Sequence, residues 1–176
     1  MHYFLLERGL SLGEPVCPTH PSDPIITPMS LESTDAPNLA LCILLGERRF
    51  ALLARQVLHI YPMVAWHALE HPHSSIVAVV RVAERLVSVV DPRAALGLPA
   101  ARVEVSQHLL ELSNVNKSAG QNSSQNSFLL WVDQVEGTLS LERQHTQGLP
   151  TGGPIGAFGF AQNVEYPVLE VGFFAP

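Results

Sequence analysis

Apolar runs and a short polar break alternate in the segment 76–99, which reads IVAVVRVAERLVSVVDPRAALGLP. The apolar runs Val77–Val82 and Leu86–Val90 flank the break at Ala83-Glu84-Arg85. Valine and isoleucine are restricted at χ1 and suit a pleated surface, so this pattern predicts a β-hairpin. Asp91-Pro92 is expected to end the second strand and to start one short helical turn that Asp91 caps.

Most of the remaining chain also has the pattern of short strands. Apolar stretches bounded by turn residues predict strands at 39–45, 49–53, 59–64, 107–114, 128–132, 135–141, 155–161 and 166–171. Helical periodicity is scarce, so the fold class is expected to be all-β with a few short helical turns. Residues 1–38 differ, because prolines recur there among Ser, Thr and Asp, and we expect a disordered extension followed by one globular domain at 39–172.

The chain contains two weak internal matches in the same order. FALLARQV at 50–57 aligns with FLLWVDQV at 128–135, and the hairpin 76–91 aligns with 155–170. The two matches together predict two similar subdomains. Each is expected to be a small β-barrel, since closure hides the edges of short antiparallel strands.

Composition narrows the functional classes. The chain of 176 residues has a net charge of −6 and no basic cluster, which argues against a nucleic-acid partner. No apolar run reaches the roughly 18–20 residues that span a bilayer, so no membrane insertion is expected and the default location is the cytoplasm. The sequence has no nucleophile elbow, P-loop or dinucleotide fingerprint, and we therefore predict neither a cofactor nor catalysis.

Two groups of polar residues are candidates for metal binding or catalysis. His67, His71 and His73 could ligate zinc, but only Glu70 lies near them as a further ligand, so a surface loop without metal is favoured. The second group consists of carboxylates that each end a predicted strand: Asp91, Asp133 and Glu170. Structural capping of free backbone N–H groups is favoured over acid–base catalysis for all three.

Three motifs in this order resemble the CheW-like domain of bacterial chemotaxis coupling proteins. They are VLHI at 57–60, VVDPRAALGLP at 89–99 and WVDQVEG at 131–137, and the resemblance covers about 39–171. It implies two small SH3-like five-stranded β-barrels. It also implies binding to the regulatory domain of a CheA-like histidine kinase and to the cytoplasmic tip of a chemoreceptor.

The chain departs from the family pattern at the predicted hairpin. Ala83-Glu84 stands where the family has Arg-Gly, Ala78 replaces a glycine, and His59 replaces the glutamate of the first motif. Glycine adopts positive φ at no cost, so Glu84 is expected to be strained in the turn. Glu84 also places a negative charge where the family presents a positive one, which reverses electrostatic selection of partners.

The sequence thus predicts a non-catalytic adaptor that couples a chemoreceptor to a CheA-like kinase in chemotaxis or in a chemotaxis-like system such as twitching motility. Such a protein would act in the cytoplasm at receptor arrays. The alternative is a small β-barrel metal-binding or ligand-binding protein, or an enzyme, that uses the loop of His67, His71 and His73. The candidate partner-binding residues are Val57, His59, Ile60, Val80, Val82, Ala83, Glu84 and Leu86. Alternating strand residues point to opposite faces, so the apolar members of this set belong either to the core or to an interface.

Overall fold

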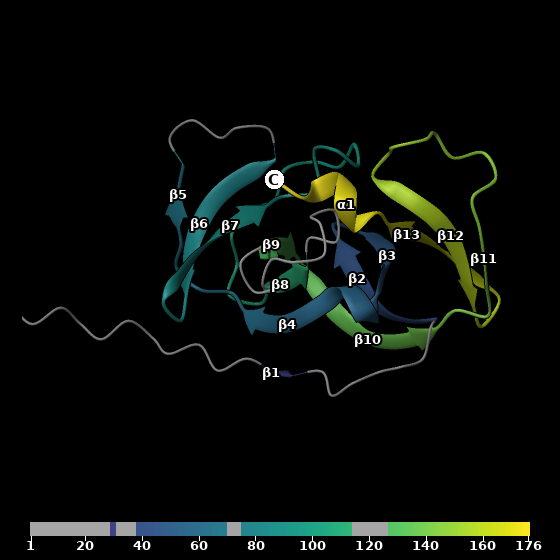
Figure 1. Ribbon diagram of the computed structural model, residues 1–176, viewed down its shortest axis with the longest axis horizontal. Helices are drawn as coiled ribbons and strands as arrows, with labels where there is room; N and C mark the ends of the chain where they lie inside the picture. Colours follow the sequence, from purple (N-terminus) through teal and green to yellow (C-terminus); the bar gives the residue numbers. More distant parts are fainter. Residues whose placement is uncertain (1–28, 31–37, 70–74, 114–126) are drawn as a thin grey trace, which may run out of the picture.

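The computed structural model describes residues 29–30, 38–69, 75–113 and 127–176. The chain forms two mixed sheets that lie side by side (Figure 1). The first sheet has the strand order β1 (Met29–Ser30), β4 (Val57–Pro62), β8 (His108–Ser113), β9 (Ser127–Val132), β7 (Arg85–Val90), β6 (Ile76–Val82), β5 (His67–Ala68). The second has the order β10 (Gln134–Ser140), β2 (Leu39–Leu45), β3 (Arg48–Leu53), β13 (Val164–Leu169), β12 (Ile155–Ala161), β11 (Arg143–His145).

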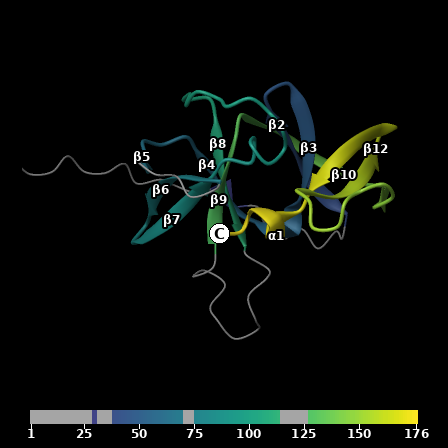
Figure 2. The ribbon, with the colours of Figure 1, turned by 90° about the horizontal axis from the view of Figure 1, so that it is seen from above.

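Five strands of six or seven residues make up each sheet, and the short strands β1, β5 and β11 extend them. We call the sheet with β4 to β9 the first barrel and the sheet with β10 to β13 the second barrel. The helical elements are a 3-10 turn at Ala54–Gln56 and the helix α1 at Val171–Phe174, which lies between the barrels (Figure 2). The predicted all-β, two-barrel fold class is confirmed.

The barrels do not coincide with the sequence repeats. The matched segments extend from β3 to β7 and from β9 to β13, but β3 lies in the second barrel while β9 lies in the first. The reason is that β3 continues through the 3-10 turn into β4, which belongs to the other sheet. Each barrel is therefore built from strands of both repeats, and the expectation of one barrel for each repeat is wrong.

Strand pairing repeats in register. A bulge between Val57 and His59 in β4 matches one between Val135 and Gly137 in β10, at an offset of 78 residues. The hairpins β6–β7 and β12–β13 share a bulge near their first residue. These irregularities fix which positions of the two barrels are equivalent, since a slip of one residue would reverse the faces.

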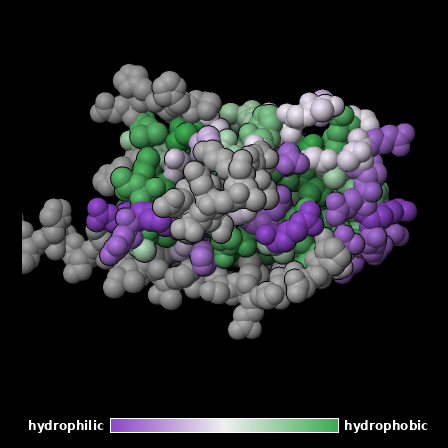
Figure 3. Space-filling model, in the orientation of Figure 1, coloured by the Kyte–Doolittle hydropathy of each residue, from purple (hydrophilic) through white to green (hydrophobic). Residues whose placement is uncertain are grey.

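Three apolar cores follow from this arrangement. The largest lies between the barrels and takes side chains from both, such as Leu41, Leu110 and Phe128. A second fills the first barrel around Trp131, and a third lies inside the second barrel and is rich in alanine. On the face shown in Figure 3, hydrophobic residues gather over β6 and β7, and hydrophilic residues cover the right-hand end over β11.

The predicted N-terminal extension falls mostly outside the described residues. Within it, Met29–Ser30 forms β1 and pairs antiparallel with β4, with Met29 opposite Ile60 and Ser30 opposite His59. Pro62 predicted an edge position for β4, and this strand has β1 as its neighbour on one side and β8 on the other. A two-residue strand thus covers part of the edge that β4 would otherwise form.

Candidate partner-binding surface

The tip of the β6–β7 hairpin carries the most exposed large apolar residue in the described strands. Register pairs Arg81 with Leu86 and Val82 with Arg85, so Ala83 and Glu84 form the turn. Leu86 keeps 73% of its surface exposed, and Arg81, Ala83 and Glu84 are exposed beside it. An exposed leucine ringed by polar residues has the composition of a small interface anchor.

Positive φ in this turn falls at Ala83, with a value of 52°, and not at Glu84. The expectation that Glu84 would be strained is therefore wrong. The turn places its left-handed residue first, so the cost of lacking a glycine falls on alanine.

Four of the predicted partner-binding residues are buried. Val57 and Ile60 pack into the core between the barrels, and Val80 and Val82 pack inside the first barrel. Alternate residues of a barrel strand fill its interior, which accounts for Val80 and Val82, whereas Val57 and Ile60 lie on the face of β4 that packs in the shared core. His59, Ala83, Glu84 and Leu86 remain accessible.

His59 and the hairpin tip are joined through the buried carboxylate of Glu111, which is 1% exposed. Arg85 Nη2 donates to Glu111 Oε1 at 3.0 Å, and His59 Nδ1 lies 3.0 Å from Oε2. Ser127 Oγ donates to Oε1 at 2.6 Å and Tyr61 OH donates to Oε2 at 2.9 Å. These five side chains, which we call the Glu111 cluster, come from the adjacent strands β4, β8, β9 and β7 of the first barrel.

The environment keeps Glu111 ionised. Burial by itself raises the pKa of a carboxyl, but hydrogen bonds from Ser127, Tyr61, Arg85 and His59 outweigh it and hold the pKa of Glu111 below its ordinary value. Burial and the bond to Glu111 raise the pKa of Tyr61, so this phenol stays a donor. The Arg85 guanidinium is thereby fixed next to Leu86 at the hairpin tip.

The sequence held one signal for this cluster that was missed. Glu111 interrupts an apolar strand, HLLELS, at a position where alternation calls for a buried residue. A charge at such a position needs partners. Which partners it has could not be predicted, because Tyr61, Arg85 and Ser127 come from three other strands.

The three strand-end carboxylates each accept a backbone N–H. Asp91 Oδ1 accepts from Arg93 N at 3.0 Å, Asp133 Oδ2 accepts from Gly46 N at 2.6 Å, and Glu170 Oε1 accepts from Gly172 N at 3.3 Å. Asp91 and Asp133 also hold the guanidinium of Arg93, at 2.9 and 2.7 Å. Arg93 is 1% exposed and lies 4.4 Å from the ring centroid of Trp131. This network ties the turn after β7 to the β2–β3 turn of the second barrel.

The histidine loop yields no metal site within the described part of the chain. No group of three or more His, Cys, Asp or Glu side chains there could hold a metal ion. His71 and His73 lie outside the described residues, as does Glu70. Across the described ranges, no helix has the length and apolar character to cross a membrane.

Two sheets that exchange strands around a shared core define a two-barrel β-domain, and comparison with known proteins identifies its class. The model of the CheW-like domain family matches residues 39–160. The chain therefore belongs to the CheW-like domain family. The structure is similar to that of the scaffolding protein TtCheW from Thermoanaerobacter tengcongensis, with a TM-score of 0.65 and 11% identity over 78% of this chain and 92% of that chain. At this identity the likeness shows the fold alone. A comparison with curated proteins gives no match.

Proposed function

We propose that this protein is a non-catalytic adaptor that couples the cytoplasmic tip of a chemoreceptor to the regulatory domain of a CheA-like histidine kinase. Membership of the CheW-like family and the two-barrel fold support this role. The system would be chemotaxis or a chemotaxis-like array such as that of twitching motility, on the cytoplasmic side of the membrane. The mechanism is surface complementarity, in which an apolar anchor supplies affinity and flanking polar groups select the partner.

The observation that carries the proposal is the exposure of Leu86 at the tip of the β6–β7 hairpin. A strand residue with 73% of its surface exposed stabilises the monomer little. Arg85 beside it is held by Glu111, so the tip has a fixed shape before any partner arrives. Preorganisation of this kind lowers the entropic cost of binding.

The test is binding of the purified protein to the regulatory domains of the CheA-like kinases from its own organism. Leu86→Asp should weaken binding by at least about tenfold, because loss of a central anchor costs roughly 2 kcal/mol. The matched control is Val105→Asp, since Val105 is a 91% exposed valine outside the hairpin. Equal affinity of the wild type and the Leu86 variant would remove the hairpin tip from the interface.

A further inference from the structure

The second barrel has an opening along one side. Strand β10 is an edge of its sheet and pairs with β2 in the described structure. The chain then crosses to β11, where Glu142 N donates to Phe160 O at 2.8 Å and joins the β12–β13 hairpin. Between these two points β10 and the hairpin are separated, and we call this gap the open seam.

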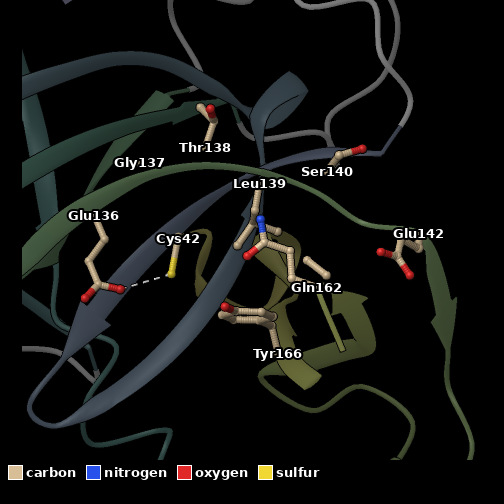
Figure 4. A pocket seen from close by; sticks show the side chains of 10 residues that line it. Cys42, Glu136, Gly137, Thr138, Leu139, Ser140, Glu142, Gln162 and Tyr166 are labelled. Carbon is tan, nitrogen blue, oxygen red and sulfur yellow. Dashed lines mark hydrogen bonds between the residues drawn. The ribbon is translucent and has the colours of Figure 1, made fainter. Parts of the chain in front are cut away.

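A cavity of about 450 Å³ occupies the open seam. Five consecutive residues of β10, from Glu136 to Ser140, form one wall, and Ala161, Gln162 and Tyr166 form the other (Figure 4). Cys42 lies at its inner end and donates to Glu136 at 3.3 Å. Consecutive strand residues along a cavity mean that it follows the backbone of β10, whose outward N–H and C=O groups form an edge that can accept another strand.

The equivalent edge in the first barrel already carries a strand. There β1 pairs with β4, with Met29 opposite Ile60 and Ser30 opposite His59. The offset of 78 residues that relates β4 to β10 places Thr138 at the position of Ile60 and Gly137 at that of His59. An extended segment that pairs with β10 in the same way would lie opposite Thr138 and Gly137.

Charge indicates what such a segment would carry. The described residues that line the cavity include the carboxylates of Glu136 and Glu142 and no lysine or arginine. Arg49 approaches Glu136 at 2.6 and 2.8 Å but is not part of the lining, and no ion pair of Glu142 occurs within the described residues. Arg49 balances the charge of Glu136, so a lysine or arginine that enters the seam would meet complementary charge at Glu142 on its rim.

We propose that the open seam of the second barrel is a β-addition site for an extended segment of a partner protein that carries a lysine or arginine. Backbone hydrogen bonds to β10 would supply affinity, and the basic side chain beside Glu142 would supply specificity. This surface is separate from the hairpin tip of the first barrel and does not depend on the adaptor role proposed for it.

The test begins with a displayed library of random decapeptides selected on the full-length protein. Enriched peptides are expected to share a lysine or arginine, and the amides of residues 137–140 should show the largest NMR shifts when a synthetic copy of one binds. Glu142→Gln should weaken that peptide three- to tenfold in an anisotropy titration, as expected for a charge at the rim of a site.

The matched control is Glu47→Gln, which removes an exposed glutamate from the β2–β3 turn of the same barrel and should leave affinity unchanged. Circular dichroism of each variant establishes that it is folded. Absence of enriched peptides, enrichment of neutral or acidic sequences, or NMR shifts confined to the β6–β7 hairpin would each overturn the proposal. Binding of spermidine at residues 137–140 without binding of any peptide would also overturn it, because the site would then take a small cation.

Discussion

Equivalent interior positions of the two barrels carry side chains of different size. The strand registers place Leu109, Glu111 and Leu129 of the first barrel at the positions that Ala40, Cys42 and Ala51 occupy in the second. Further along, Val80 and Val82 of the first barrel correspond to Gly159 and Ala161 of the second. Each exchange in the second barrel removes side-chain volume. The first interior is consequently packed around Trp131, whereas the second holds a small alanine-rich core beside a cavity of about 450 Å³.

The polar side chains at equivalent interior positions of the two barrels also differ. In the first, Glu111 accepts hydrogen bonds from four side chains of adjacent strands. In the second, Cys42 stands at the equivalent position, and Gly137 stands where the first barrel has His59. The carboxylate nearby belongs to Glu136 and pairs with Arg49 at the surface.

The two barrels share backbone features although their interior side chains differ. Asp91 N donates to Ser75 O at 2.9 Å and Glu170 N donates to Pro154 O at 3.0 Å, at equivalent points of the two hairpins. Bulges and strand ends fix the register, so they tolerate little change.

The largest expected effect distinguishes two equivalent strand-end carboxylates, Asp91 in the first barrel and Glu170 in the second, because Asp91 binds the buried Arg93. Arg93→Ala should lower the free energy of unfolding by about 3 kcal/mol, because it leaves the carboxylates of Asp91 and Asp133 without their buried cation. Glu170→Ala at the equivalent cap should cost about 1 kcal/mol or less, since it loses one long hydrogen bond to Gly172. Urea unfolding of the two variants measures both values. Equal losses would mean that Arg93 does not hold the barrels together.

A second difference between the barrels is the charge at Glu111. Glu111→Gln should cost about 2 kcal/mol at pH 7, because an amide cannot accept from all four donors. The folded-state pKa of Glu111 is depressed, so its stabilisation is present above the unfolded value of about 4.3 and is lost as pH falls through the folded value. The gap in unfolding free energy between wild type and variant should therefore shrink from pH 5 to pH 3.

The control for that experiment is Cys42→Ala at the equivalent position of the second barrel. Burial raises the pKa of the Cys42 thiol to about 11, so the thiol stays protonated throughout the acid range. Its loss should depend on pH much less than that of Glu111→Gln, because Cys42 gives the exposed Glu136 one hydrogen bond and Arg49 is the larger cause of the lowered pKa of Glu136. A gap for Glu111→Gln that stays constant over this range would show that the carboxylate does not titrate with folding.

Sequence patterns predicted the hairpins, the repeat and the family, because strand periodicity and turn residues are local properties. They failed where the outcome depends on which strands become neighbours. Val57 and Val82 have the same alternation whether the face they occupy meets a core or a partner, and only the barrel closure decides. The placement of β2 and β3 in the second barrel could not be predicted either, since no local sequence feature marks the 3-10 turn after β3 as the point where the chain crosses to the other barrel.

A third prediction concerns the volume lost from the second barrel. A Cβ added at Gly159 would lie 2.8 Å from Leu141 Cδ2, so Leu141 fills the space that Val80 takes in the first barrel. Gly159→Ala should destabilise by about 1–2 kcal/mol through overpacking. The double variant Gly159→Val/Leu141→Ala should be more stable than the sum of its single changes by about 1 kcal/mol. Additive losses in thermal unfolding would show that these two positions do not share one space.

The smallest expected effect lies in the two hairpin turns. Ala83 in the β6–β7 turn has φ of 52°, and Gln162 and Asn163 in the β12–β13 turn have φ of 50° and 64°. Alanine gains nothing in the left-handed region, whereas asparagine tolerates it. Ala83→Gly should therefore stabilise by about 0.5–1 kcal/mol, because relief of the backbone strain exceeds the added entropy of the unfolded chain.

The two matched substitutions are expected to lower the stability slightly or to leave it almost unchanged. Glu84→Gly should destabilise by about 0.5 kcal/mol, because Glu84 has no positive φ to relieve and the glycine only adds unfolded-state entropy. Asn163→Gly should change stability by no more than a few tenths of a kcal/mol. Chemical denaturation of the three variants ranks them. A stabilising Glu84→Gly would place the strained residue of the turn at position 84, where the sequence alone had located it, and would show that the hairpin turns in solution have a different φ pattern.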